Sequence, residues 1–143
     1  MVKQKNDKTI VLGFDFGTKR IGVAVGQFIT RTASPIGILT AYQGIPDWNT
    51  IKALKDDWKA TAFVVGMPYN MDGTEQKITE DARQFGQKLK KLFKLPVYFV
   101  DERLTTKAAQ WFLKEKEVKK RLHNPRKVDS LAAKIILESF LRK

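Results

Sequence analysis

Two short apolar runs near the start of the chain, residues 9–16 and 20–29, are separated by only three residues, Gly17-Thr18-Lys19. Both runs contain β-branched and aromatic side chains, which are typical of strands, and so short a connection favours a hairpin between them. A third run with strand character follows at 34–42. The first part of the chain is therefore predicted to form an antiparallel meander.

The rest of the chain alternates between helix and strand patterns. Apolar residues at 48, 51, 54 and 58 recur at helical spacing and predict a helix over 47–58 with Asp47 as its N-cap. The remaining predicted elements are a strand at 62–68, a helix from Thr74 or Glu75 to about Phe93, a strand at 96–102, a helix at 105–117 with a threonine N-cap, and a last helix at 128–141. This order predicts one α/β domain over residues 1–143, with a mixed central sheet and helices on both faces.

Composition narrows the classes of protein. The chain has 143 residues, 43% of them hydrophobic, and no apolar run approaches the roughly 20 residues that span a bilayer. The N-terminal residues carry cations but no long apolar stretch, so no signal peptide is expected. Cysteine is absent, which excludes disulfides and thiolate metal sites. We expect a cytoplasmic protein without a membrane partner.

Charge indicates the partner. Lys and Arg number 27 against 15 Asp and Glu, a net charge of +12, which favours binding to nucleic acid. The segment 114–127 carries seven cations and two anions, and its residues Lys119, Lys120, Arg121, Arg126 and Lys127 are predicted phosphate contacts. The single histidine, His123, lies in the same segment and is interpreted as a surface residue.

Four acidic residues occupy positions where elements begin or end: Asp15, Asp101, Glu102 and Asp129. Neighbouring strand residues point to opposite faces, so Asp101 and Glu102 cannot both face one site while the strand continues. Asp129 shares a helical stripe with Ala132, Ala133, Ile136 and Phe140, which predicts that it faces the sheet. A first-turn acid stabilised by the helix dipole is an equally good interpretation of Asp129.

Carboxylates without histidine or cysteine suit Mg²⁺ or Mn²⁺ rather than zinc. A pair of such ions can activate a water molecule and stabilise the leaving oxygen when a phosphodiester is cleaved. The acids and the basic surface together predict a metal-dependent phosphodiesterase.

Four stretches in order resemble the YqgF/RuvX family: DFGTKRIGVAVG (15–26), VVGMPYNMDGTEQ (64–76), DERLTT (101–106) and VDSLAAKIILESF (128–140). The resemblance extends over residues 9–141. It implies an RNase H-like fold and a divalent-metal site formed by Asp15, Glu102 and Asp129, with Asp15 as the central ligand that bridges two ions. It also implies that Asp101 is a neighbour of the site rather than a ligand.

The family is described both as Holliday junction resolvases and as nucleases that process pre-16S rRNA. The resemblance therefore implies a hydrolase, a Mg²⁺- or Mn²⁺-dependent endonuclease that acts on the 5′ end of pre-16S rRNA, with the pre-ribosome as a partner. Two alternatives stay open: a resolvase of branched DNA, and a non-catalytic RNA-binding factor of ribosome assembly. Lys19, Arg20 and Arg103 are further candidate nucleic-acid contacts, although Lys19 also suits a solvated turn and Arg103 an ion pair with Asp101. Both a monomer and a homodimer are compatible with the sequence.

Overall fold

The computed structural model describes residues 9–105 and 125–143, with side chains described for 9–105 and 130–143. The strands are β1 (Ile10–Asp15), β2 (Arg20–Gln27), β3 (Thr32–Tyr42), β4 (Ile45–Pro46), β5 (Ala62–Met67) and β6 (Val97–Asp101). The helices are α1 (Trp48–Trp58), α2 (Lys77–Phe93), the short 3₁₀ turn η1 (Glu102–Leu104) and α4 (Pro125–Leu141). The helix predicted at 105–117 lies almost entirely outside the described residues.

The six strands form one mixed sheet in the order β4-β3-β2-β1-β5-β6. Strands β1, β2 and β3 are antiparallel neighbours, as the hairpin signals predicted, with a register shift between Val23 and Ala24. Strands β1, β5 and β6 run parallel to one another. Their carboxyl ends therefore lie at one edge of the sheet, where α/β proteins commonly place a site.

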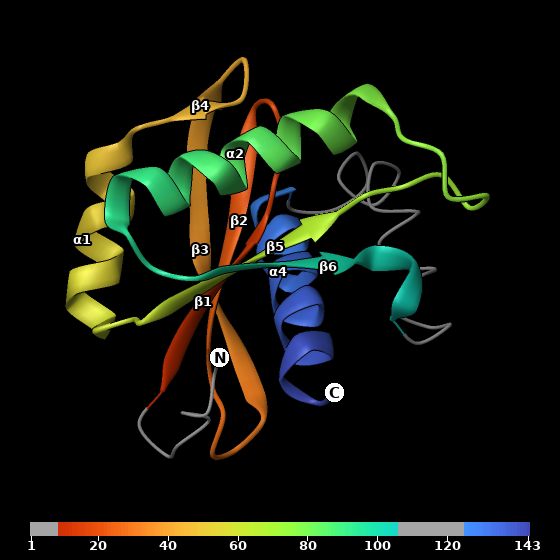
Figure 1. Ribbon diagram of the computed structural model, residues 1–143. Coiled ribbons are helices and arrows are strands. Elements are labelled where there is room, and N and C mark those ends of the chain that lie inside the picture. The colour runs from red at the N-terminus through yellow and green to blue at the C-terminus, as the bar shows by residue number, and fades with distance from the viewer. Residues whose placement is uncertain (1–8, 106–124) are drawn as a thin grey trace.

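Helices cover both faces of the sheet, as predicted (Figure 1). Leu12, Phe14, Phe63 and Val65 pack on the face that carries α1 and α2. Val11, Val64 and Val100 pack with α4 on the other face. Because side chains alternate along a strand, these two sets tell us which face each later residue of β1, β5 and β6 points to.

Boundaries differ from the sequence predictions at several points. Helix α2 begins at Lys77 rather than Thr74 or Glu75, because a hydrogen-bonded turn occupies the preceding residues. Helix α4 begins at Pro125 rather than 128, and proline is well suited to a first helical position. The sequence also gave no sign of the two-residue strand β4. Trp58 ends α1 with 42% of its surface exposed, so the apolar stripe of that helix is buried only in part. In the described part of the chain, no helix has the length and hydropathy that a membrane span requires.

Candidate metal site at the carboxyl ends of the strands

Three positions at the carboxyl ends of the neighbouring parallel strands β1, β5 and β6 define the candidate site: Asp15, Gly66 and Glu102, the last in the turn η1 that follows β6. Phe14 of β1 pairs with Val65 of β5, and continuing this register by one residue places Asp15 level with Gly66. Gly66 in turn pairs with Val100, two residues before Glu102. Asp15 has the strand parity of Val11, and Gly66 that of Val64, so both positions lie on the α4 face.

Asp15 ends β1 and is only 3% exposed. A carboxylate so far from water is costly unless opposite charge, hydrogen-bond donors or a metal ion stabilise it. The position and burial of Asp15 confirm the prediction that an acid stands at the end of a buried strand. Gly17 follows in the turn, where a Cβ atom would collide with the carbonyl oxygen of Arg20, so this tight connection requires glycine.

Glu102 extends over Gly66. Its Oε2 lies 2.7 Å from the position that a Cβ of residue 66 would take, and the Cδ1 of Ile136 from α4 lies 2.6 Å from that position. Strands β1 and β6 are separated by β5, so two carboxylates on them can approach only across the residue between. Gly66 leaves that space to the Glu102 carboxylate. Sequence reasoning missed this role, and the only signal was the glycine in an otherwise apolar strand.

Asp101 forms an ion pair with Arg103, which agrees with the prediction that only one of the two adjacent acids faces the site. Its carboxylate accepts hydrogen bonds from Nη2 of Arg103 at 2.7 Å and from the Arg103 backbone N–H at 2.9 Å. Partial burial acts to raise the pKa of Asp101, but the Arg103 hydrogen bonds and charge outweigh it, and the pKa is below its ordinary value. Of the two interpretations of Arg103, the structure supports the ion pair with Asp101.

Arg103 also connects the strand end to the loop after β5. Its Nη1 donates to the Met71 carbonyl at 3.4 Å, and its guanidinium lies 5.4 Å from the centre of the Tyr69 ring. In the same loop, Oδ1 of Asp72 accepts from the backbone N–H of Thr74 at 2.9 Å and from its hydroxyl at 2.6 Å. Asp72 thus stabilises the turn, and these bonds lower its pKa.

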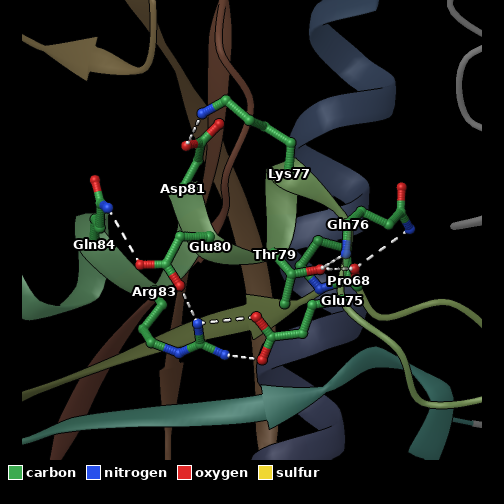
Figure 2. A network of polar contacts seen from close by, with 9 residues as sticks. All are labelled: Pro68, Glu75, Gln76, Lys77, Thr79, Glu80, Asp81, Arg83 and Gln84. Atoms are coloured by element: carbon green, nitrogen blue, oxygen red, sulfur yellow. Dashed lines mark hydrogen bonds and ion pairs between the residues drawn. The ribbon is translucent and has the colours of Figure 1, made fainter.

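The beginning of α2 anchors the other end of this loop (Figure 2). The buried hydroxyl of Thr79 donates to the Pro68 carbonyl at 2.6 Å and accepts from the Gln76 backbone N–H at 3.0 Å. Arg83 pairs with Glu75 just ahead of the helix and with Glu80 within it. Hydrogen bonds therefore fix both ends of the loop between β5 and α2, which favours a rigid backbone beside the candidate site.

Helix α4 carries the third predicted ligand. Ala132, Ala133 and Ile136 are fully buried against the sheet, and helical spacing puts position 129 on the same stripe, one turn earlier. The prediction that this stripe faces the sheet is confirmed for those three residues, while Phe140 is partly buried. The side chain of Asp129 lies outside those that are described.

The candidate nucleic-acid contacts are only partly within the described region. Lys19 is exposed in the β1–β2 turn and Arg20 begins β2 with its side chain half-buried, both close in sequence to Asp15. Lys119, Lys120, Arg121 and His123 lie outside the described residues. Arg126 and Lys127 fall in the first turn of α4, but their side chains are not described.

The donor set fits a hard divalent cation. Asp15 and the Glu102 carboxylate supply oxygen atoms on one side of the sheet, which are the donors that Mg²⁺ and Mn²⁺ prefer. Among residues with described side chains, no group of three acidic, histidine or cysteine residues could hold a metal ion. A site with three acids therefore needs a further ligand, and Asp129 is the predicted one.

Comparison with known proteins is consistent with this arrangement. Residues 9–143 match a family model described as "RuvX: Holliday junction resolvase". A protein of Coxiella burnetii (strain RSA 493 / Nine Mile phase I) with the name "Putative pre-16S rRNA nuclease" is 54% identical over 140 residues, covering 96% of both chains. A protein of the same name from Saccharophagus degradans is 47% identical over 133 residues, covering 93% of both.

Two solved structures share the fold at low sequence identity. Thermus thermophilus RuvC, in complex with a Holliday junction substrate, has a TM-score of 0.53 and 16% identity over 93% of both chains. The fowlpox virus resolvase, in complex with Holliday junction DNA, has a TM-score of 0.51 and 12% identity over 94% of this chain and 100% of that one. The predicted RNase H-like fold is thereby confirmed.

Proposed function

This chain belongs to the RuvX family, and from that premise together with the carboxylate edge of the sheet we propose that it is a divalent-metal-dependent endonuclease that processes the 5′ end of pre-16S rRNA. The observation that carries the proposal is the position of the Glu102 carboxylate over Gly66, on the face to which the buried Asp15 belongs. Asp129 of α4 is proposed as the third ligand.

Each acid has a defined part in this proposal. Asp15 would hold Mg²⁺ or Mn²⁺ from the centre of the sheet, Glu102 from β6 and Asp129 from the helix. Bound there, the ion would lower the pKa of a water molecule and neutralise charge on the phosphate. The protein contributes a fixed geometry, because Asp15 ends a central strand and Glu102 lies between Asp101 and Arg103, whose ion pair anchors the backbone on both sides of it.

Cations would bring the phosphate backbone to this edge. The net charge of +12 supports general attraction to a polyanion, and Lys19 and Arg20 stand four and five residues beyond Asp15. Lys119, Lys120, Arg121, Arg126 and Lys127 stay predicted contacts. Contacts of this kind add affinity that falls with salt and carry little sequence information. Arg103 is a weaker candidate than the sequence suggested, because its guanidinium is bonded to Asp101.

The names of the relatives favour precursor rRNA as the substrate. Action on the pre-ribosome in the cytoplasm is part of this proposal. The family description supports a second candidate, resolution of branched DNA. That activity requires two symmetric cuts and so favours a homodimer, whereas rRNA processing is compatible with a monomer. In the remaining alternative, the protein is a ribosome-assembly factor that binds the RNA but does not cleave it.

A parallel cleavage assay tests the proposal. A four-way DNA junction and a 5′-extended 16S rRNA precursor are each incubated with Mg²⁺, Mn²⁺ or EDTA. The variants are Asp15→Asn, Glu102→Gln and Asp129→Asn, and Asp56→Asn serves as control because this carboxylate is exposed on α1 and pairs with Lys52 and Lys55. We expect metal-dependent cleavage of the precursor, lost in the three variants and kept in the control.

Each other outcome has a definite meaning. Cleavage of the junction alone would assign the protein to DNA resolution. Binding of the precursor without cleavage, unchanged by the three substitutions, would overturn the nuclease proposal in favour of the assembly factor. Full cleavage in all three variants would show that another group carries the chemistry.

A further inference from the structure

The tip of the β3–β4 hairpin forms a rigid unit with the β1–β2 turn. Gln43 and Gly44 both have positive φ angles, 51° and 83°, as in the two-residue turn that matches strand twist. The backbone N–H of Ala41 donates to the Lys19 carbonyl at 2.8 Å, and that of Gly44 to the Thr18 carbonyl at 2.9 Å. Two backbone hydrogen bonds from the β1–β2 turn therefore hold the hairpin tip at the end of the sheet where Asp15 lies.

A pocket of about 400 Å³ opens between this unit and the first turns of α2. Its lining includes Thr18, Lys19, Tyr42, Lys77 and Asp81. The volume is within the roughly 300–1,000 Å³ of small-molecule sites. The β1–β2 turn, the β3–β4 hairpin and helix α2 thus meet around this space, and of its lining residues only Lys19 already has a proposed contact with the substrate.

Tyr42 is the distinctive side chain of this pocket, because 76% of its surface is exposed although its backbone is fixed. An aromatic ring that is presented to solvent on a rigid turn loses little conformational entropy when a flat ligand stacks on it. Aromatic rings of this kind are what unpaired bases stack on in RNA and single-stranded DNA.

Charge around the ring fits the same ligand. Lys19 is exposed, and among the described residues no hydrogen bond or ion pair of its ammonium group is found. Nζ of Lys77 donates to Oδ1 of Asp81 at 2.9 Å, so this pair offers donors and an acceptor without net charge. A base edge needs such a mixed set of polar groups, whereas a phosphate needs a cation such as Lys19.

We propose that this pocket binds an unpaired nucleotide of the substrate, with its base stacked on Tyr42, its edge facing Lys77 and Asp81, and a phosphate at Lys19. The inference rests on the proposed function, since it names a part of the same nucleic-acid substrate. Asp15 faces α4 while the pocket is lined by α2, so the bound strand crosses the end of the sheet between them. Lys19 comes four residues after Asp15, at most roughly 14 Å of chain, so the stacked base lies within a few nucleotides of the cleaved bond.

Binding in EDTA tests the pocket without cleavage. Fluorescence anisotropy is measured with a labelled single-stranded RNA of about ten nucleotides and with a blunt duplex of the same sequence. Tyr42→Ala removes the ring and Tyr42→Phe keeps it. Ile45→Ala is the matched control, because Ile45 pairs with Tyr42 across the hairpin and is 64% exposed, but does not line the pocket.

We expect Tyr42→Ala to bind the single strand roughly 5- to 100-fold more weakly, the range for loss of one base-stacking ring. Tyr42→Phe and Ile45→Ala should bind as the wild type does, and the duplex should not distinguish the variants. Equal binding of the single strand by wild type and Tyr42→Ala overturns the proposal. Equal losses in Tyr42→Ala and Ile45→Ala also overturn it, because they would indicate a general apolar contact.

The assay separates this inference from the nuclease proposal. Loss of binding in Tyr42→Ala supports the pocket even if no metal-dependent cleavage is found. Conversely, cleavage that needs Asp15 while Tyr42→Ala binds the single strand normally would support the nuclease and reject the pocket.

Discussion

The sharpest test of the site is Gly66→Ala, which adds one methyl group between Asp15 and Glu102. The added Cβ would lie 2.7 Å from Glu102 Oε2 and 2.6 Å from Ile136 Cδ1, where ordinary contacts begin at 3.4 Å. The Glu102 oxygen must therefore move by about 0.7 Å, the difference between 3.4 and 2.7 Å. Displacements near 1 Å can reduce catalysis by about 100-fold, so we expect kcat to fall roughly 10- to 100-fold.

The same methyl group also strains the packing against α4. Overpacking of a core costs about 1–3 kcal/mol, and loss of glycine entropy from the unfolded chain offsets about 0.4–1 kcal/mol of that. A net loss of up to about 2.6 kcal/mol in the free energy of unfolding follows. With an unfolding entropy of about 2.1 cal/mol/K per residue, this lowers Tm by up to about 9 °C in a domain of 143 residues. Activity must therefore be measured well below the variant's Tm.

Two variants separate the effect on the site from the effect on stability. Gly26→Ala is the matched control, since its Cβ would lie 2.7 Å from Leu141 Cδ1 on the same helix, with no carboxylate among the nearest atoms. The double variant Gly66→Ala/Ile136→Val removes the clash with Cδ1 but keeps the clash with Glu102. We expect stability to recover in the double variant while kcat stays low. Wild-type kcat in Gly66→Ala, or an equal loss of kcat in Gly26→Ala, would refute the role assigned to Gly66.

Three further predictions concern the supports of the site. Thr79→Val should lower the free energy of unfolding by about 1–3 kcal/mol in urea denaturation, because the half-buried Pro68 carbonyl loses its close donor and the Gln76 N–H loses its acceptor; Thr79→Ser should restore both bonds. Asp101→Asn should cost about 1 kcal/mol at pH 7. Arg103 holds the pKa of Asp101 below its ordinary value near 3.9. The ion pair therefore stabilises the fold above this pH, and this stabilisation is lost as the pH falls through the lower, folded-state pKa. A difference in free energy of unfolding between wild type and variant that did not narrow between pH 5 and pH 2 would contradict the ion pair. In a plot of the logarithm of the RNA-binding constant against the logarithm of salt concentration, Lys19→Ala should reduce the slope by about one. An unchanged slope would show that Lys19 contacts no phosphate.

The elements that the sequence predicted well are those with strong local signals. Two apolar runs joined by Gly17-Thr18-Lys19 predicted a hairpin of two strands. They pair as the antiparallel strands β1 and β2. Asp47 caps α1 through a hydrogen bond from the Asn49 N–H at 2.9 Å, as its position before an amphipathic run indicated. Alternation predicted that Asp101 and Glu102 do not both face one site while the strand continues, and β6 continues as far as Asp101.

What the sequence could not provide depends on contacts between distant residues. Gly66 reads as one small residue in an apolar strand until Glu102 and Ile136, 36 and 70 residues later, are placed against it. The two-residue strand β4 is too short for a pattern, and it forms because the β1–β2 turn fixes the hairpin beside it. Tyr42 likewise appears in the sequence as the last residue of a strand, and only the tertiary fold places its ring beside Lys77 of α2.

These contacts explain why adjacent acids at one strand end have separate tasks. Because β6 continues to Asp101, residues 101 and 102 leave the sheet on opposite sides, and only Glu102 has the parity of the α4 face. Asp101 neutralises Arg103, and Nη1 of Arg103 ties the strand end to the Met71 carbonyl, so the pair fixes the backbone around Glu102 without adding a third carboxylate beside Asp15 and Glu102. A one-residue slip of β6 would exchange the two roles. The site thus depends on the register of β6 as much as on the identity of its acids.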